Sequence, residues 1–295
     1  MIRLSSFVRF FVFCSYMIHI GMNDRLFPSN WRPITQDIAF AQAHGFTHIQ
    51  FHGRPNGLGA EDLGVSLSET GAALHAARVG AVMEIVVRLD ATCRTLESKL
   101  PIDVLEANLP TIEALGCTHV HWHPVQSERL AATGLRALEA RLYEQLAAGV
   151  ELSRAHGFRF GFEHNEPATG LFGEPEYCAA ALEAVPDVSF VWDVNHTRLD
   201  QLDMYLAFAP RMSMLHLADT PLPEVNHHLP IGMGNIDFAY CFRELLGGGF
   251  DGPGILEIGG LPRSGGYGRD TDEALIESRD RLLTIIADCR LQIAD

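Results

Sequence analysis

The sequence contains no closely spaced pair of cysteines. Its six cysteines, at positions 14, 93, 117, 178, 241 and 289, are scattered along the chain, and none forms a C-x-x-C motif. A disulfide framework and a zinc knuckle both need cysteines in a tight or regular array, so this spacing argues against both. We therefore expect reduced thiols and a cytoplasmic protein.

Long uninterrupted apolar runs are also missing. The segment 7–20 is apolar, follows Arg3 and imitates a short secretory signal, but it has no clear small-residue cleavage site. Arg9 interrupts it, and it falls short of the ~20 apolar residues that a membrane-spanning helix needs. We interpret residues 1–16 as a nonessential extension, whose presence in the native product the sequence leaves open, and we expect no membrane association.

Positive charge is scarce. The chain has 22 Lys and Arg against 37 Asp and Glu, which gives a formal net charge of −15. Such a charge repels the phosphates of nucleic acids and anionic lipids. With 47% hydrophobic residues, the composition supports a large buried core. The sequence therefore predicts small polar ligands and no nucleic-acid partner, and leaves a homo-oligomer open.

Short apolar segments rich in Val, Ile and Phe alternate with segments of helical period. Glycines 45, 80, 116 and 157 each fall where a helix is expected to end. The predicted strands are residues 17–21, 47–52, 81–88, 118–123, 159–164, 189–193, 212–217 and 254–258. The predicted helices are residues 34–44, 68–77, 102–115, 135–156, 175–185, 198–208, 238–246 and 271–288. Eight such units predict one (β/α)₈ barrel domain, a TIM barrel, over residues 17–295.

Metal-binding residue types stand at the ends of five predicted strands. In a (β/α)₈ barrel such side chains face the active-site mouth. One of them, Glu257, lies in the apolar run Ile-Leu-Glu-Ile-Gly. An unpaired carboxylate there would cost several kcal/mol, and several converging acids would cost more unless a cation neutralised them. The strand-end residues are His123, Glu163, Asp193 with His196, His216 and Glu257.

Three carboxylates and one imidazole would form a site with mostly oxygen ligands. The residues that supply them are Glu163, Asp193, His216 and Glu257. Such a site favours manganese or magnesium, and cobalt or zinc is also compatible with it. A single acid at a strand end is as readily a salt-bridged structural group. Four such residues on consecutive strands favour one divalent metal ion as the cofactor.

Five motifs resemble the xylose-isomerase-like superfamily of sugar isomerases and epimerases, over roughly residues 17–290. They are Phe-Glu-His-Asn at 162–165, Trp-Asp-Val-Asn-His at 192–196, Leu-His-Leu-Ala-Asp at 215–219, His-Leu-Pro-Ile-Gly-Met-Gly-Asn-Ile-Asp at 228–237 and Ile-Leu-Glu at 255–257. The resemblance implies that Glu163, Asp193, His216 and Glu257 bind the metal. It also implies that His196 faces the substrate or a second metal.

The same resemblance implies a reaction. In the ketose epimerase branch, the glutamates matching Glu163 and Glu257 face opposite sides of the substrate carbon and exchange its proton. The implied activity is isomerisation or epimerisation of a sugar or polyol through an enediolate next to a metal-bound carbonyl and hydroxyl. No organic cofactor is implied.

Two further histidines are predicted to contact the substrate. His121 and His123 alternate with Val120 and Trp122, so one set faces the barrel lumen and the other faces the helices, and we place only His123 in the site. The segment 228–237 is expected to form a loop over the mouth, which brings His228 towards the ligand. Adjacent histidines such as His227 and His228 are also typical of a solvated turn. The predicted substrate contacts are therefore His123, His196 and His228.

Three other functions remain as alternatives. A dehydratase of a cyclic polyol or keto acid would remove the same proton and then expel a neighbouring hydroxyl. Apurinic-site endonucleases share the superfamily, but Asn226 stands where they have an aspartate, and Val87 and Arg88 replace a histidine ligand. The negative charge also disfavours DNA. A noncatalytic sugar-binding barrel would need fewer charged groups in its mouth.

Overall fold

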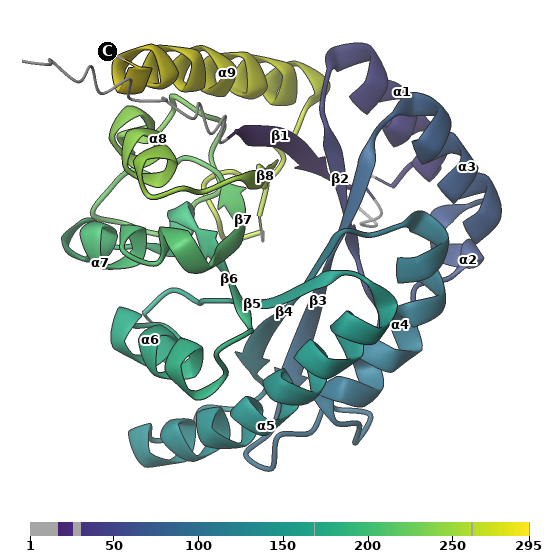
Figure 1. Cartoon of the computed structure of the whole chain (residues 1–295), viewed down its shortest axis with the longest axis vertical. Helices are drawn as coiled ribbons and strands as arrows, with labels where there is room; N and C mark the ends of the chain where they lie inside the picture. Colours follow the sequence, from purple (N-terminus) through teal and green to yellow (C-terminus); the bar gives the residue numbers. More distant parts are fainter. Residues whose placement is uncertain (1–16, 26–30, 168, 261, 295) are drawn as a thin grey trace, which may run out of the picture.

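Eight parallel strands close into a barrel in which each strand pairs with the next along the chain and β8 pairs with β1 (Figure 1). The computed structural model describes residues 17–25, 31–167, 169–260 and 262–294. The predicted fold class is thereby confirmed, and the predicted extension 1–16 lies outside the described residues. The strands are β1 (Ile18–Asn23), β2 (His48–His52), β3 (Gly80–Leu89), β4 (His119–Gln126), β5 (Arg159–Glu163), β6 (Ser189–Asp193), β7 (Met212–Leu217) and β8 (Gly252–Leu256).

Helices follow the strands and form the outer layer (Figure 1). They are α1 (Ile34–His44), α2 (Ala60–Leu63), α3 (Leu67–Ala77), α4 (Pro101–Leu115), α5 (Ala132–His156), α6 (Pro175–Ala184), α7 (Leu202–Leu206), α8 (Phe238–Gly247) and α9 (Asp272–Ala294), with short 3₁₀ turns η1 (Val194–His196), η2 (Leu199–Gln201) and η3 (Ala209–Arg211). The helix predicted over 198–208 is broken into η2 and α7. Leu199 and Met204 there are 62% and 49% exposed, so its apolar residues do not form one buried face.

Three of the four predicted glycine helix ends take the left-handed conformation. Gly45, Gly116 and Gly157 have φ angles of 70°, 64° and 76°. The prediction for Gly80 is wrong, because Gly80 is the first residue of β3. A Cβ at Gly80 would lie 2.6 Å from Cδ2 of His48, so close approach of two strands requires glycine there.

The strands β1 and β8 are shifted relative to the prediction. β1 continues to Asn23 because Asn23 pairs with Gln50 of β2. β8 begins at Gly252, which pairs with Ile18 of β1. Glu257 therefore lies one residue beyond β8 rather than within it. Both shifts bring polar residues to the same end of the barrel.

The barrel interior has an apolar layer below that polar end. Val82, Val191, Met214 and Ile255 form a buried cluster separate from the main core between strands and helices. Because side chains alternate along a strand, each of these residues lies one layer below the residue two positions further on. Those residues are Glu84, Asp193, His216 and Glu257. The polar groups thus rest on an apolar floor that gives them no hydrogen-bond partners.

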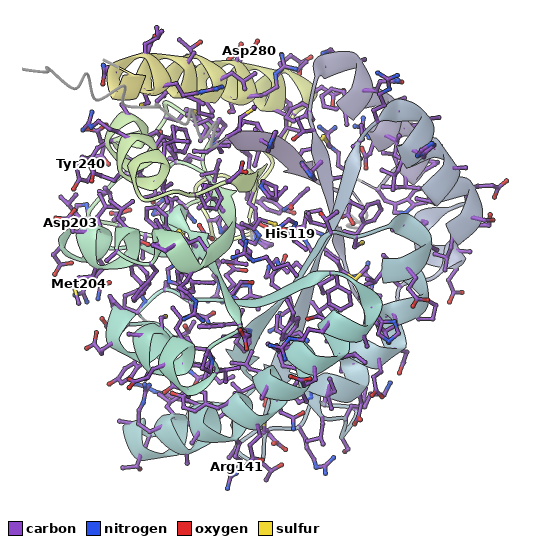
Figure 2. All side chains as sticks on the ribbon, in the orientation of Figure 1. His119, Arg141, Asp203, Met204, Tyr240 and Asp280 are labelled. Carbon is purple, nitrogen blue, oxygen red and sulfur yellow. The ribbon has the colours of Figure 1, made fainter. Side chains whose placement is uncertain are left out.

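Side chains fill the space between strands and helices, while Asp203, Tyr240 and Asp280 lie at the outer edge (Figure 2). The cysteines of the described part, Cys93, Cys117, Cys178, Cys241 and Cys289, are free and buried. The described helices are all too short or too polar to span a membrane.

Candidate metal centre

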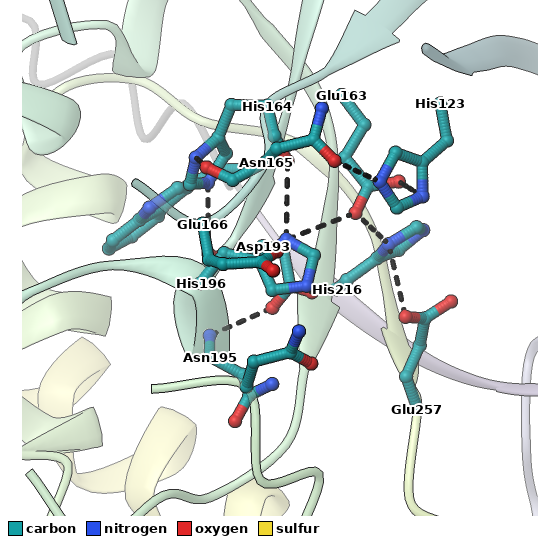
Figure 3. A network of polar contacts seen from close by, with 12 residues as sticks. His123, Glu163, His164, Asn165, Glu166, Asp193, Asn195, His196, His216 and Glu257 are labelled. Carbon is teal, nitrogen blue, oxygen red and sulfur yellow. Dashed lines mark hydrogen bonds and ion pairs between the residues drawn. The ribbon is translucent and has the colours of Figure 1, made fainter. Parts of the chain in front are cut away.

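The four predicted metal ligands converge at the carboxyl ends of the strands. Nδ1 of His216 lies 3.2 Å from Oε1 of Glu163 and 3.3 Å from Oε2 of Glu257. Asp193 belongs to the same cluster, since ligand atoms of Asp193, His216 and Glu257 lie within 4.8 Å of one another. Figure 3 shows His216 between the two glutamates. Asp193, His216 and Glu257 therefore form one group, and Glu163 reaches this group through Nδ1 of His216.

The carboxylate of Glu163 is surrounded by histidine rings. Its Oε2 lies 3.4 Å from both His121 Nε2 and His123 Nδ1. Its Oε1 lies 3.2 Å from His216 Nδ1 and 3.7 Å from His196 Nδ1. Burial alone would raise the pKa of the Glu163 carboxyl, but the imidazoles of His123 and His216 hold that pKa well below its ordinary value. Glu163 is therefore an anion in a fully buried place.

Asp193 and His216 also have pKa values that are shifted by burial and by neighbouring charges. Burial raises the pKa of the Asp193 carboxyl to about 7, an effect that His228 opposes. The carboxylates of Glu163 and Glu257 raise the pKa of Asp193 further. Burial alone would lower the pKa of His216, but the same two carboxylates raise it to about 10. The cluster thus attracts positive charge.

The residues fit a divalent cation. Four buried atoms of the cluster make no hydrogen bond within the described part of the chain. They are Oε1 and Oε2 of Glu163, Oδ2 of Asp193 and Nδ1 of His216. Six ligand atoms at about 2.1 Å from one ion lie about 3–4 Å apart. The 3.2 Å and 3.3 Å separations around His216 Nδ1 match that spacing. A shared cation would satisfy the atoms that the protein leaves without partners.

The predicted substrate contacts His123 and His196 border this cluster. His123 places Nδ1 at 3.0 Å from Glu84 Oε1 and Nε2 at 3.0 Å from Asn165 Oδ1. His196 places Nε2 at 3.2 Å from Asp193 Oδ2. The side chain of His123 is 18% exposed and that of His196 only 5%. Of the two, His123 is the more accessible from the mouth.

His228 lies in the loop between β7 and α8, which is held at the mouth. Its Nδ1 donates to the backbone oxygen of Glu257 at 2.8 Å, and its Nε2 lies 2.8 Å from Asn226 Oδ1. The Oδ1 of Asn195 accepts from the backbone N–H groups of His227 and His228, at 3.1 Å and 3.2 Å. His228 is thus fixed beside Glu257 rather than in a free solvated turn.

The prediction that only His123 of the strand-four pair reaches the site is wrong. His121 also faces the barrel interior, and its ring packs edge-on against that of His216 with 5.0 Å between the ring centres. Burial lowers the pKa of His121. The alternation along β4 gives both histidines the same face, while Trp122 between them packs outward on Phe160.

Sequence reasoning also missed a row of charged groups across β1 to β4. Nδ1 of His52 lies 2.9 Å from Asp24 Oδ1, and Nε2 of His52 lies 3.2 Å from Glu84 Oε2. Glu84 reaches His123 in turn. Burial alone would raise the pKa of Glu84, but hydrogen bonds from His123 and His52 hold it well below its ordinary value. The signal in the sequence is an acid, Glu84, inside the apolar run of β3, just as Glu257 lies in an apolar run.

Comparisons with known proteins support this fold. No curated protein matches the chain. A structure of L-ribulose 3-epimerase matches with a TM-score of 0.72 and 17% identity, over 94% of this chain and 97% of that chain. The IolI protein with a bound zinc atom matches with a TM-score of 0.69 and 14% identity, over 92% of this chain and 99% of that chain. A family 2 AP endonuclease from Brucella melitensis matches with a TM-score of 0.62 and 17% identity, over 86% of this chain and 97% of that chain.

Identities this low show a shared fold and nothing more. The family model described as the xylose isomerase-like TIM barrel matches residues 38–283, which is most of the chain. The matched segment includes every strand from β2 to β8, and with them all four predicted metal ligands. This chain belongs to the xylose isomerase-like TIM barrel family.

Proposed function

We propose that this protein is a divalent-metal-dependent isomerase or epimerase of a sugar, with the metal held by Glu163, Asp193, His216 and Glu257. The observation that carries the proposal is the grouping of Asp193 and Glu257 with His216, whose Nδ1 also lies 3.2 Å from Glu163, where buried atoms lack hydrogen-bond partners among the described residues. The likeness to L-ribulose 3-epimerase supports a sugar substrate, and the zinc atom in the IolI structure supports a metal.

In this proposal the two glutamates move the proton. Glu163 at the end of β5 and Glu257 just after β8 each have an oxygen within 3.3 Å of Nδ1 of His216. A carboxylate on each side of a substrate carbon can remove a proton from one face and return one to the other. A divalent cation, when bound, supplies the Lewis acidity that stabilises negative charge beside a carbonyl.

Burial sets the direction from which a substrate approaches. The side chains of Glu163 and Asp193 are each 1% exposed and that of His216 is 0% exposed. Those of Glu257 and His123 are 12% and 18% exposed. The substrate therefore reaches the site between Glu257 and His123. His228 and its loop lie beside Glu257 at this opening.

Solvent exchange tests the proposal. We expect the manganese-loaded protein in deuterated water to incorporate deuterium next to the carbonyl of a ketopentose or ketohexose. Loss of water from a cyclic polyol, without exchange into ketoses, would instead identify a dehydratase. Cleavage of an oligonucleotide with an abasic site would identify a nuclease. Absence of all three reactions across a ketose and polyol panel would exclude the proposed activity.

Metal affinity is expected to increase with pH. His216, with a pKa of about 10, and Asp193, with a pKa of about 7, hold protons that the metal must displace. Lowering the pH therefore weakens binding, and binding releases about two protons at pH 6 and about one at pH 8. Titration calorimetry in two buffers of different ionisation enthalpy measures this number. Binding that is independent of pH from 6 to 8 would contradict the assignment.

A further inference from the structure

Gln50 of β2 is fully buried and touches residues from four other parts of the barrel. Its Nε2 lies 2.7 Å from Glu257 Oε1, 3.0 Å from Asn23 Oδ1 and 3.3 Å from Glu84 Oε2. Its Oε1 lies 2.8 Å from Nε2 of His216. One carboxamide therefore contacts two of the four residues that the proposed function assigns to the metal.

The chemistry of these partners fixes which way the amide points. Ionised carboxylate oxygens accept hydrogen bonds and do not donate them, so the end that faces Glu257 and Glu84 must be the NH₂ group. The oxygen must then face His216. Because an amide oxygen only accepts, Nε2 of His216 must carry a hydrogen and donate it to Gln50.

This hydrogen bond determines what His216 presents to a cation. With Nε2 occupied by its hydrogen, the nitrogen left to bind a metal is Nδ1. Nδ1 is the atom that faces Glu163 and Glu257 and makes no hydrogen bond to any described residue. Without the Gln50 oxygen, no hydrogen bond from Nε2 would hold the ring with Nδ1 towards those two carboxylates.

The same amide orients Glu257. Oε1 of Glu257 accepts from Gln50 at 2.7 Å and from Nδ2 of Asn23 at 3.3 Å. The second oxygen, Oε2, is thereby turned towards His216 Nδ1. One oxygen is thus held by the protein, and the other is directed to the point where the ligands converge.

We infer that Gln50 is a positioning residue that presents Nδ1 of His216 and Oε2 of Glu257 together to the bound metal ion. Partners of this kind typically change metal affinity by about 10–100-fold when they are removed. The inference rests on the proposed metal site and adds to it a residue from β2, a strand that supplies none of the four ligands.

The test compares Gln50→Leu with Gln50→Met, which preserves more of the side-chain volume and guards against a failure to fold. Zn²⁺ affinity is measured by competition with a chromophoric chelator. In the ¹⁵N-histidine spectrum of the zinc-loaded protein, the Nε2 proton of His216 is identified by its loss in His216→Asn. Gln201→Leu is the matched control, since Gln201 is also buried and donates to a carboxylate, that of Glu174, away from the four ligands.

We expect both Gln50 variants to bind Zn²⁺ at least about 10-fold more weakly than the wild type and to lose the slowly exchanging Nε2 proton. The Gln201→Leu variant should keep both properties. A folded Gln50 variant with an affinity within about twofold of the wild type would overturn the inference while leaving the metal site intact. A wild-type protein that binds no divalent ion would overturn the inference and the proposed function together.

Discussion

Replacing Glu257 with glutamine is expected to slow exchange of the substrate C–H proton with solvent by roughly 10²–10⁴-fold. An amide cannot take up the proton that a carboxylate accepts. The substitution also changes the contact with His216, because the donors Gln50 and Asn23 would hold the new amide oxygen in the place of Oε1. The amide NH₂ would then point at Nδ1 of His216, now 3.3 Å from Oε2, and compete with the metal.

The matched control for this substitution is Glu113→Gln. Oε1 of Glu113 lies 2.7 Å from Nδ1 of His156, so it is also a carboxylate beside an imidazole, but on the outer surface. Exchange is followed by proton NMR in deuterated water, and folding by urea denaturation. A Glu257→Gln protein that is folded and exchanges protons at the wild-type rate would exclude Glu257 from catalysis.

Removal of the metal with a chelator is expected to reduce exchange to the background rate, and addition of manganese should restore it. Without the ion, the chain keeps Glu163 and Glu257 as base and acid. The negative charge that develops beside the substrate carbonyl, however, is no longer stabilised. The cluster would also regain its electrostatic repulsion, since oxygens of Glu163 and Glu257 both lie within 3.3 Å of Nδ1 of His216. Binding at a concentration of 100 times Kd adds about 2.7 kcal/mol to the free energy of unfolding.

Activity and thermal unfolding are both measured on the same chelated samples. We expect the melting temperature to rise by several degrees when manganese is added back, in step with activity. Calcium, which prefers longer bonds and more ligands, is the informative comparison ion. Full activity in a sample whose metal content is far below one ion per chain would contradict the account.

The half of the site contributed by β5 to β8 could be predicted from sequence. Glu163 and Asp193 end short, mostly buried strands and His216 is the last but one residue of its strand, so their position along the chain also gives their position in the barrel. Glu257 follows β8 directly. The rule that strand ends meet at one mouth was enough to bring these residues together.

The half contributed by β1 to β3 was missed for a different reason. Glu84 lies in the middle of β3, which continues to Leu89, so it does not stand at a strand end. Gln50 and Asn23 are amides, a residue type that gives no metal signal in a sequence. Their roles depend on register, since pairing of Asn23 with Gln50 sets both beside Glu257. Register between strands distant in sequence is not visible in local periodicity.

The error at His121 shows what strand alternation can decide. Alternation correctly separates Trp122 from its two histidine neighbours, and the structure puts Trp122 against Phe160. It gives His121 and His123 the same face, so both reach the interior at different depths. Depth in a barrel depends on strand tilt and shear, which the sequence alone does not provide.

Diffraction from crystals soaked with Mn²⁺ tests the central claim most directly. An anomalous peak should lie within about 2.0–2.4 Å of one atom from each of Glu163, Asp193, His216 and Glu257. The histidine ligand should be Nδ1, with Nε2 still bonded to Gln50. A peak bound by other residues, or none at saturating manganese, would contradict the account.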